Sequence, residues 1–282
     1  MRSRKGAAKA GHRKPTKTVG YHRYIQATPS HLAQIMILNI VHLGRIDYAA
    51  GLDIQKKLVE ARHAQHIGNT LLLLEHPPVL TLGRNSSRAN IVASDELLTR
   101  RGVQVHEINR GGDVTYHGPG QLVGYPIFDL RSFTPRLGAV EYVRLLEEAL
   151  IRVCGDFSVP AQRIAGRTGV WTIAGGAIPE KKIAAIGIHI ARGITSHGFA
   201  LNVTTDLRDF DLIVPCGISD RTVTSLDLEA DVQNTVNPAP TMENTLHLTA
   251  KQFGRVFDQQ VLWLESLADL NIEEFALQEQ SR

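Results

Sequence analysis

The segment from Arg110 to Gln121 combines residue types that bind small molecules. Within twelve residues it holds four glycines, a proline, a histidine and an arginine. Glycines at this density allow the backbone to approach a ligand closely and to adopt positive φ angles. Its polar side chains come from Arg110, Thr115, Tyr116, His117 and Gln121. A hairpin rich in turn residues is the structural alternative, but these side chains exceed what a turn requires, so we expect a binding loop.

Cys216 and Lys182 are the candidates for covalent chemistry. Cys216 lies between Pro215, which fixes the approach of the chain, and Gly217, which leaves the thiol accessible. A thiol of pKa ~8.5 needs a nearby cation or base to act as a nucleophile at neutral pH. Lys182 precedes an apolar run, and desolvation at a strand end would lower the pKa of its ammonium. A lone cysteine is otherwise a small buried hydrophobe, which is our expectation for Cys154.

Length and composition are those of a globular protein. The chain has 282 residues, of which 43% are hydrophobic, enough for one large α/β domain or two smaller ones. No apolar run approaches the ~18 residues of a membrane-spanning helix, so we predict no membrane association. The two cysteines and the lack of an apolar secretory segment at the N-terminus favour a reducing cytoplasm.

Residues 1–35 carry eight Lys and Arg side chains and no Asp or Glu. Because this segment has little apolar content on which to fold, we predict a disordered basic extension. A nucleic-acid-binding tail and a transit peptide are the alternatives. Nothing downstream has a basic patch interleaved with aromatic residues or a zinc-ligand spacing, so we predict no nucleic-acid partner.

From residue 36 onward, strands alternate with helices in the predicted structure. Runs of apolar, largely β-branched residues predict strands at 36–43, 70–75, 103–108, 122–130, 169–173, 183–190 and 199–203. Helical spacing of apolar residues predicts helices at 48–62, 94–100 and 137–153, with a final helix beginning near 249. We expect a loop at 81–90 and, because of its two prolines, a linker at 234–240.

Particular side chains are assigned to these helices. Asp47 is expected to cap the first helix, with Leu52 and Val59 at helical spacing. In the third helix, Arg144 and Glu148 are spaced for an i,i+4 ion pair. In the final helix, Gln252 completes a capping box with Thr249. The residues expected to be buried there are Phe253, Val256, Phe257, Val261 and Leu264.

Five separated motifs together resemble those of the lipoyl(octanoyl) transferases, across roughly residues 36–230 and in the same order. They are Glu75 to Arg84, Arg110 to Gln121, Lys182 to Gly187, Thr195 to Asn202, and Pro215 to Ile218 followed by Val223 to Leu226. The resemblance implies an enzyme that moves an octanoyl group from acyl carrier protein to a lysine of lipoyl domains. It also implies an α/β fold of the α+β type, with a mixed sheet flanked by helices, similar to the catalytic domain of biotin and lipoate protein ligases.

The same resemblance implies the roles of individual residues. Cys216 corresponds to the acyl-accepting thiol and Lys182 to the lysine that lowers its pKa. The Lys-Ile-Ala-Ala-Ile-Gly match selects Lys182 over the adjacent Lys181. The substrate-contacting positions correspond to Arg110, Gly111, Gly112, Asp113, Val114, Thr115, Tyr116, His117, Ala185, Ile186, Gly187, Gly198, Phe199 and Ala200.

In the implied reaction, Cys216 attacks the octanoyl thioester of acyl carrier protein while Lys182 accepts the thiol proton. A lipoyl-domain lysine then attacks the acyl-enzyme and forms an amide. Backbone N–H groups near Gly217 or in the glycine-rich segment are expected to stabilise the oxyanion. No cofactor and no metal are required. The implied acceptors are the lipoyl domains of 2-oxoacid dehydrogenase complexes and the glycine cleavage H protein.

Two other classes of function stay open at this point. The leading rival is an ATP-dependent lipoate or biotin protein ligase of the same fold, which activates a free acid and needs no cysteine. A more distant rival is a non-enzymatic relative that only binds lipoyl domains or nucleic acid.

Side chains near the predicted site receive supporting roles. Ile186, Phe199 and Leu201 are expected to line the acyl pocket, with ordinary sheet core as the alternative for Leu201. His117 is expected to position the substrate or to relay a proton.

Other polar side chains are expected further from the reacting atoms. His76 and His197 would brace loops, and Arg84 and Arg110 would meet the acidic surface of the carrier protein. We therefore predict a cytoplasmic protein with three parts: a basic extension at 1–35, a catalytic domain at 36–230, and a linker with a C-terminal helix at 231–282.

Overall fold

The computed structural model describes residues 36–175, 179–214, 223–233 and 238–272. The chain divides into two units, Met1–Gln34 and Ile35–Arg282, and every described residue belongs to the second unit. The basic extension at 1–35, most of the linker at 234–240 and Cys216 therefore lie outside the described residues.

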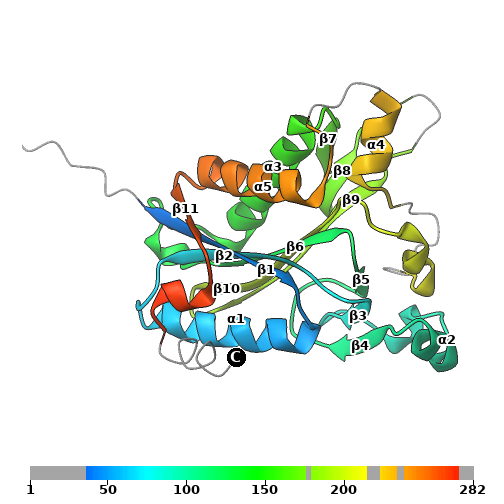
Figure 1. Ribbon diagram of the computed structural model, residues 1–282, viewed down its shortest axis with the longest axis horizontal. Coiled ribbons are helices and arrows are strands. Elements are labelled where there is room, and N and C mark those ends of the chain that lie inside the picture. The colour runs from blue at the N-terminus through cyan, green and yellow to red at the C-terminus, as the bar shows by residue number, and fades with distance from the viewer. Residues whose placement is uncertain (1–35, 176–178, 215–222, 234–237, 273–282) are drawn as a thin grey trace, which may run out of the picture. The chain divides into compact units, whose positions relative to one another are not determined.

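An eight-stranded mixed sheet forms the centre of the second unit (Figure 1). Its strands, in spatial order, are β11 (Gln260–Leu264), β1 (Ile37–Arg45), β2 (Asn69–Glu75), β6 (Gln121–Ile127), β10 (Ile194–Asn202), β9 (Lys182–Ala191), β8 (Arg167–Thr172) and β7 (Ala161–Ile164). β1 runs parallel to β2 and β11, whereas the other neighbours are antiparallel. The predicted mixed sheet is confirmed, and β7 and β11 are additions to the predicted strands.

Helices cover both faces of this sheet (Figure 1). The helices are α1 (Tyr48–His63), α2 (Asp95–Arg100), α3 (Ala139–Asp156), α4 (Leu226–Gln233) and α5 (Met242–Val256). Along β2, Leu71 and Leu73 pack into one core with α3 and α5, whereas Leu72 and Leu74 pack into another core with α1. Successive side chains of a strand point to opposite faces, so an uninterrupted run of leucines produces a strand buried on both sides.

The helix predicted at 48–62 is confirmed as α1, although two details differ. Asp47 stands at the N-cap, but its side chain makes no capping hydrogen bond. Leu52 and Val59 are only half-buried. The face turned to the sheet instead includes the polar side chain of Gln55 beside Leu58.

The helix predicted at 137–153 is confirmed as α3, but the predicted ion pair of Arg144 with Glu148 is wrong. Arg144 pairs with Glu147, Nη1 to Oε2 at 2.7 Å, and the Glu147 side chain is fully buried. Glu148 pairs with Arg152 and Arg163 instead. Because a buried carboxylate needs compensating charge more than a half-exposed one does, the arginine turns to Glu147.

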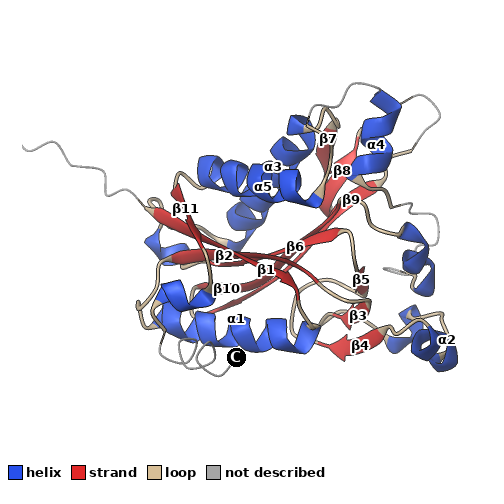
Figure 2. Cartoon of the chain, in the orientation of Figure 1, coloured by secondary structure: helices blue, strands red, loops and turns tan. Residues whose placement is uncertain are grey.

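A three-stranded sheet lies beside the large one (Figure 2). Its order is β4 (Gln104–Glu107), β3 (Val79–Leu82) and β5 (Thr115–His117). The loop predicted at 81–90 is therefore partly wrong, since it begins inside β3 and ends in the 3₁₀ helix η1 (Arg88–Asn90). β5 places part of the glycine-rich segment in a strand. The helix predicted at 94–100 is confirmed as α2, and the side chain of Ser94 caps it by accepting from Leu97 N.

The prediction of a helix that begins near residue 249 is wrong. α5 begins at Met242, and the Thr241 side chain accepts the capping hydrogen bond from Asn244 N. Thr249 and Gln252 are buried in the middle of this helix. Val261 and Leu264 belong to β11. The local spacing of a capping box was present, but the preceding prolines already separate the helix from the chain before it.

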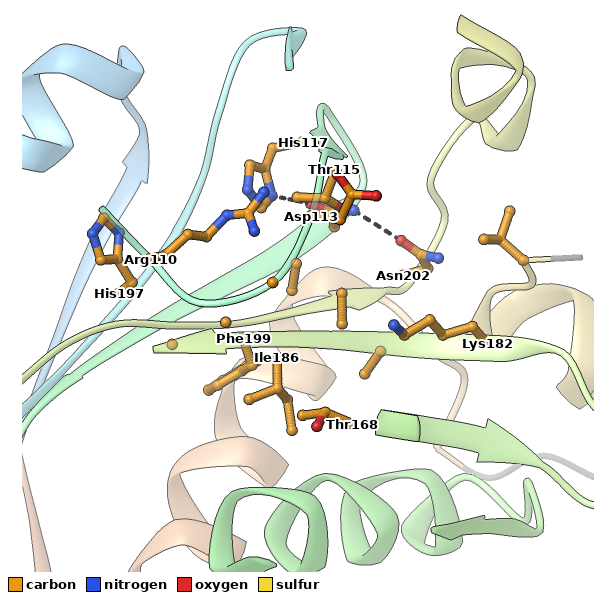
Figure 3. A pocket seen from close by; sticks show the side chains of 18 of the residues that line it. Arg110, Asp113, Thr115, His117, Thr168, Lys182, Ile186, His197, Phe199 and Asn202 are labelled. Atoms are coloured by element: carbon orange, nitrogen blue, oxygen red, sulfur yellow. Dashed lines mark hydrogen bonds between the residues drawn. The ribbon is translucent and has the colours of Figure 1, made fainter. Parts of the chain in front are cut away.

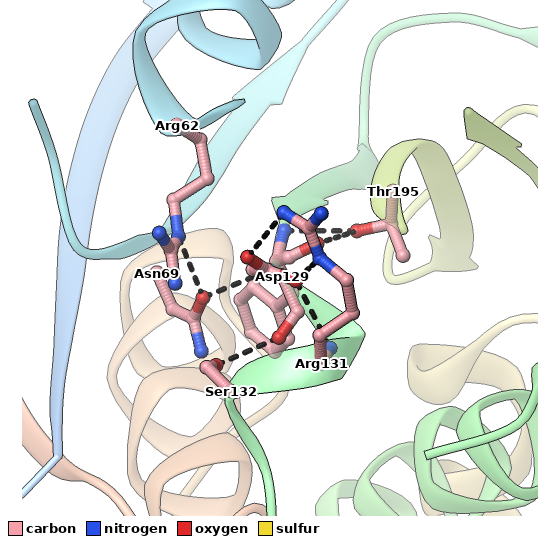
Figure 4. A network of polar contacts seen from close by, with 7 residues as sticks. Arg62, Asn69, Asp129, Arg131, Ser132 and Thr195 are labelled. Carbon is pink, nitrogen blue, oxygen red and sulfur yellow. Dashed lines mark hydrogen bonds and ion pairs between the residues drawn. The ribbon is translucent and has the colours of Figure 1, made fainter. Parts of the chain in front are cut away.

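A partly buried polar cluster, here named the Asp129 cluster, ties α1 to the ends of β2, β6 and β10 (Figure 4). It consists of Arg62, Asn69, Asp129, Arg131, Ser132 and Thr195, of which Arg131 and Ser132 belong to the 3₁₀ helix η2 (Leu130–Ser132). The Arg131 side chain donates two hydrogen bonds of 2.8 Å to the Asp129 carboxylate. Asn69 Oδ1 accepts from Arg62 Nε at 3.1 Å and from Asp129 N at 3.0 Å. Although burial favours the neutral acid, the hydrogen bonds and charge of Arg131 hold the pKa of Asp129 below its usual range.

Candidate active site

A cavity of about 250 Å³ lies between strands β9 and β10 and the glycine-rich segment at 110–121 (Figure 3). α1 contributes Tyr48 to its wall, β6 contributes Tyr125, and the 3₁₀ helix η3 (Leu207–Leu212) contributes Phe210. One part of the wall is apolar and includes Ile186 and Phe199. The cavity therefore combines an apolar surface with polar groups on the opposite side.

The structure brings together twelve of the fourteen residues predicted to contact the substrate. Those that line the cavity are Arg110, Gly112, Asp113, Val114, Thr115, His117, Ala185, Ile186, Gly187, Gly198, Phe199 and Ala200. Tyr116 points away into the core of the small sheet, where its hydroxyl donates to Asp209 Oδ2 at 2.8 Å. Gly111 lines a neighbouring cavity, and its N–H donates to Ile188 O at 2.9 Å.

The Arg110 guanidinium is buried in the cavity wall, with 7% of the residue exposed. Nη2 donates to Thr81 O at 2.7 Å and to Thr81 Oγ1 at 2.8 Å, and Nη1 donates to Gly111 O at 3.0 Å. Among the described residues, no carboxylate forms an ion pair with it. Burial lowers the pKa of Arg110. The predicted contact of Arg110 with the surface of a carrier protein is therefore wrong, whereas Arg84 is exposed.

Glycines create the space that Arg110 occupies. A Cβ atom at Gly83 would lie 2.8 Å from Arg110 Nη1 and 2.5 Å from Gly112 O. A Cβ atom at Gly187 would lie 2.8 Å from Gly111 O and 3.1 Å from Arg110 Cδ. Both contacts are closer than carbon and its neighbours tolerate, so side chains at these positions would displace the arginine or the glycine-rich segment.

A chain of hydrogen bonds with a fixed direction crosses the site behind the cavity. Asn202 Nδ2 donates to the carbonyl of Thr224 at 2.8 Å, which leaves Asn202 Oδ1 to accept from Gln121 Nε2 at 2.9 Å. Gln121 Oε1 is then the acceptor for His117 Nδ1 at 2.8 Å. His117 therefore carries its proton on Nδ1 and presents a bare Nε2. Figure 3 shows His117 and Asn202 on the two sides of this chain.

Three histidines around Arg110 are held neutral. Burial, followed by the charge of His76, lowers the pKa of His117 to about 3. Burial also lowers the pKa of His76 and that of His197, each to about 4. We name Arg110, His117, His197, Gln121 and Asn202 the Arg110 cluster, which at neutral pH holds a single positive charge.

Lys182 stands at the start of β9 and points into the cavity (Figure 3). Its Nζ lies 5.2 Å from the centre of the Trp171 ring, a cation–π distance. Gly169, at a φ of +124°, leaves room for this side chain, since a Cβ there would lie 2.7 Å from Lys182 Cε. Lys181 binds Glu229 instead, Nζ to Oε1 at 3.1 Å. The register of β9 therefore places Lys182, and not Lys181, in the site.

The residues that flank segment 215–222 are anchored at the cavity. On one side, Val214 N donates to Asn90 O at 2.8 Å, and Asn90 Nδ2 donates to both carboxylate oxygens of Asp113 at 2.9 Å. On the other side, Val223 forms a parallel bridge with Lys182. Asp113, Lys182 and Val223 all line the cavity. Val214 and Val223, the described residues on either side of segment 215–222, are thus linked to residues of the cavity wall.

Several lining residues were not predicted from the sequence. They are Tyr48, Tyr125, Gly166, Arg167, Thr168, Trp171, Ala184, Phe210 and Val223. Trp171 carried the best signal, because it is one of two tryptophans and lies in a predicted strand close to the predicted base. Ile186 and Phe199 line the cavity as expected. Leu201 lies in the sheet core, which was its alternative placement.

The remaining predicted residues have structural contacts. His76 Nδ1 donates to Ile46 O at 2.8 Å, and its Nε2 accepts from the Tyr125 hydroxyl at 2.7 Å. His197 Nε2 donates to Asn109 Oδ1 at 2.9 Å. Both histidines brace neighbouring segments, as predicted. Cys154 is fully buried, and burial raises the pKa of its thiol to about 12, which confirms its structural role.

Two searches of the described part of the chain were negative. No group of three or more His, Cys, Asp or Glu side chains there could hold a metal ion. No helix there is both long enough and apolar enough to cross a membrane.

Comparisons with known proteins agree on one family. Residues 47–253 match the lipoyl protein ligase A/B catalytic domain. The chain is 72% identical over 240 residues to an octanoyltransferase of Acidobacterium capsulatum, which covers 83% of this chain and 96% of the relative. It is 55% identical over 234 residues to an octanoyltransferase of Koribacter versatilis, which covers 83% and 90%.

Solved structures support the fold. A bipartite lipoate protein ligase of Thermoplasma acidophilum aligns with a TM-score of 0.62 at 15% identity, over 88% of this chain and 93% of that chain. A lipoate-protein ligase A bound with ATP aligns with a TM-score of 0.59 at 14% identity, over 88% and 95%. At this identity the likeness concerns the fold alone, and it confirms the predicted mixed sheet of a lipoate ligase catalytic domain.

Proposed function

Because the chain belongs to the octanoyltransferases of the lipoyl protein ligase A/B catalytic-domain family, we propose that it performs octanoyl transfer through a thioester on Cys216. The chain is an acyltransferase. The proposed donor is octanoyl-acyl carrier protein, and the proposed acceptors are lysines of the lipoyl domains of 2-oxoacid dehydrogenase complexes and of the glycine cleavage H protein. The proposed location is the cytoplasm, where the thiol stays reduced.

The observation that carries this proposal is the position of Lys182 beside Val223, the first described residue after segment 215–222. Val223 bridges to Lys182 directly. Val214 is held by Asn90, which also holds Asp113 in the cavity wall. These contacts favour a thiol near Lys182 Nζ, whose neutral amine can accept a proton.

In the first proposed step, Lys182 accepts the thiol proton and the Cys216 thiolate attacks the carbonyl carbon of the octanoyl thioester. The tetrahedral intermediate expels the carrier protein's thiolate, which takes the proton from Lys182 and leaves as the thiol. One thioester replaces another, so the step is nearly neutral in free energy.

In the second proposed step, the neutral amine of the acceptor lysine attacks the same carbonyl carbon. The C–S bond to Cys216 breaks, the amide forms, and the amine proton passes to the departing thiolate through Lys182. Conversion of a thioester into an amide is downhill, so no ATP is needed. This separates the proposed reaction from that of an ATP-dependent ligase, to which the thiol would contribute nothing.

The apolar wall at Ile186 and Phe199 is the proposed site of the acyl chain. Burial of the seven hydrocarbon carbons beyond the carbonyl contributes roughly 6 kcal/mol, at ~0.8 kcal/mol for each. Phe199 can lie against the sheet because Gly124 has no side chain, and a Cβ there would lie 2.1 Å from Phe199 Cζ.

The Arg110 cluster is proposed to act on the charged species. Its buried positive charge stabilises the thiolate and the oxyanion in surroundings of low dielectric constant. The bare Nε2 of His117 accepts a hydrogen bond from an N–H of the substrate and so positions it. Backbone N–H groups of the glycine-rich segment or near Gly217 are the proposed oxyanion donors.

The test is to incubate the protein with octanoyl-acyl carrier protein without ATP and to measure its intact mass. We expect a gain of one octanoyl group that is lost in Cys216→Ala and kept in Cys154→Ala, the matched control. A lipoyl domain should then discharge the adduct. An unmodified mass, with the lipoyl domain acylated only when octanoate and ATP are supplied, would overturn the thioester mechanism.

A further inference from the structure

The outer edge of β9 is open beyond its first residues. The N–H of Thr195 on β10 donates to Phe128 O and therefore points away from β9. Ile190, the residue of β9 that pairs with Thr195, consequently makes no backbone hydrogen bond to β10. Gly111 N donates to Ile188 O from outside the sheet. The turn between β9 and β10, at Arg192 and Gly193 with φ of 51° and 85°, supports this assignment. A two-residue turn of this kind closes on a hydrogen-bonded pair, which here includes Ala191. Bonded and non-bonded pairs alternate along the strand, so Ile190 belongs to a non-bonded pair.

The neighbouring strand does not cover this edge. β8 pairs with β9 only at Lys182 and Ala184. Further along, Ile188 and Ile190 direct backbone groups away from β10. Within the described ranges, Gly111 is the single residue that makes a backbone hydrogen bond to these two, and it bonds only the Ile188 carbonyl. The N–H groups of Ile188 and Ile190 and the carbonyl of Ile190 form a row of the kind that recruits another strand.

A groove of about 440 Å³ follows this edge. Residues from both faces of β9 line it, including Ile188 and His189, so the groove opens at the edge and not over one face. Val143 of α3 lies on one side and Arg84 on the other. The groove shares Gly112, Thr168, Ile186 and Gly187 with the cavity of the active site. It is therefore continuous with the place where acyl transfer is proposed.

The charge of the groove is one-sided. A second hollow of about 430 Å³ continues it past Ile190 and adds Arg136. Together the two hollows present Arg84, Arg136 and His189, and no Asp or Glu is among their described lining residues. An acidic segment would be attracted here.

We propose that an extended, acidic segment of the acceptor domain adds to the edge of β9 as a further strand, next to the lysine that receives the acyl group. This inference rests on the proposed function. Recognition through backbone hydrogen bonds at a sheet edge suits an acceptor whose flanking side chains vary.

The short length of a lysine side chain favours the acceptor domain, and not the carrier protein, as the partner that binds in the groove. A lysine side chain extends about 6 Å from Cα to Nζ, so the acceptor backbone must come to the rim of the cavity. A carrier protein presents its acyl group on a long flexible arm and can dock further away. The open edge begins at the rim, because Ile186 lines both the groove and the cavity.

Amide hydrogen exchange of the full chain tests the proposal, measured by NMR with and without unmodified lipoyl domain. We expect at least tenfold slower exchange at Ile188 and Ile190 on binding. Gly187 and His189 are matched internal controls, because their N–H groups already bond to β10 and should change little. Unchanged exchange at Ile188 and Ile190 under saturating lipoyl domain would overturn the proposal.

Two variants connect the groove to turnover. Ile190→Pro removes an outward N–H, and Ile190→Ala is its control for the lost side chain. We expect the KM for the lipoyl domain to rise about three- to tenfold more in Ile190→Pro than in the control, the worth of about one hydrogen bond, and also to rise in Arg84→Glu. Loading from octanoyl-acyl carrier protein should be unchanged in the two Ile190 variants, as should discharge by a small free amine.

The outcomes separate this proposal from the proposed function. Equal losses in loading from the carrier protein would overturn it, because the groove would then serve the donor. Normal loading of Cys216 with no exchange protection would overturn the groove and leave the transferase intact. Protection at the edge without loading of Cys216 would support the groove and overturn the thioester mechanism.

Discussion

The Asp129 cluster and the Arg110 cluster both include residues of β10, and both bury an arginine. They differ in how its charge is balanced. In the Asp129 cluster a carboxylate lies among the cations and receives two bonds of 2.8 Å from Arg131. In the Arg110 cluster no described carboxylate forms an ion pair with the guanidinium, which donates to a hydroxyl and to carbonyls, and the charge of Asp113 acts on it only from a distance. A balanced cluster stabilises the fold, whereas an unbalanced one leaves a potential for an anion to complete.

The largest expected effect distinguishes Lys182 from the adjacent Lys181. Lys182→Ala should lower kcat by about 10³-fold, within the range of general acid–base catalysis. Lys181→Ala is the matched control, since that ammonium pairs with Glu229 and the Lys181 side chain is 34% exposed. We expect the control to stay within about twofold of the parent in steady-state transfer. Similar losses in both variants would contradict the assignment of the base.

The second prediction is that the Arg110 cluster affects activity more than stability, whereas the Asp129 cluster affects stability more than activity. Arg110→Met should reduce kcat/KM by about 100-fold and alter the free energy of unfolding by less than about 1 kcal/mol, because an unpaired buried charge is costly to the fold. Asp129→Ala should cost about 2–3 kcal/mol and leave kcat unchanged. Denaturant unfolding and transfer assays measure both quantities. A strongly destabilised Arg110→Met with normal activity would reverse the interpretation.

Acid should act on the two clusters in different pH windows. His76, His117 and His197 have folded-state pKa values of about 4, 3 and 4, below the usual 6.5. The unfolded chain therefore binds more protons below pH 6.5, and stability falls as the pH drops towards 4, by about 2 kcal/mol for each histidine at pH 5. The lowered pKa of Asp129 stabilises the fold above its unfolded value of 3.8, and that contribution is lost only below this pH.

Unfolding free energies between pH 4.5 and 7 test this difference. His117→Gln should show a shallower decline than the parent, whereas Asp129→Asn should keep the full slope in that range. If the unfolding free energy of the parent protein were constant between pH 7 and 5, the three histidines would not be buried and neutral in the folded state.

The smallest expected effect comes from an arginine at the cavity rim, outside the Arg110 cluster. Arg167 is exposed at the rim, with its guanidinium carbon 5.8 Å from the centre of the Trp171 ring. Arg167→Ala should lower kcat/KM about two- to fivefold, as expected for an exposed cation–π contact of about 0.5–1 kcal/mol. Arg208→Ala, which removes an exposed arginine paired with Asp206, should leave kcat/KM unchanged. Equal values for the two variants would place Arg167 outside the site.

Periodicity predicted most of the central sheet and three helices, because these signals are local. The leucines of β2 lie in adjacent positions, and the apolar face of α3 repeats every turn. The start of α5 was missed because Thr249 and Gln252 have the spacing of a cap, and only packing distinguishes a cap from a helix interior. β11 was missed because it lies at the sheet edge, where most of its side chains are at least half-exposed.

The site was predictable where its residues follow one another in the chain. The glycine-rich segment and the start of β9 are compact motifs, so Arg110, His117 and Lys182 could be named. Tyr48 and Trp171 come from separate elements with no neighbouring motif. Their place in the wall depends on how α1 and β8 pack, which no local pattern encodes.

The directional chain from Thr224 to His117 also limits how this protein can change over evolutionary time. Gln121 and Asn202 each use the oxygen and the nitrogen of one amide, so neither can reverse alone without setting like atoms against each other. A carboxylate at Gln121 would face Asn202 Oδ1 and unpair the link. Accepted substitutions at these two positions should therefore arise as pairs, and single replacements should behave as intermediates of low fitness.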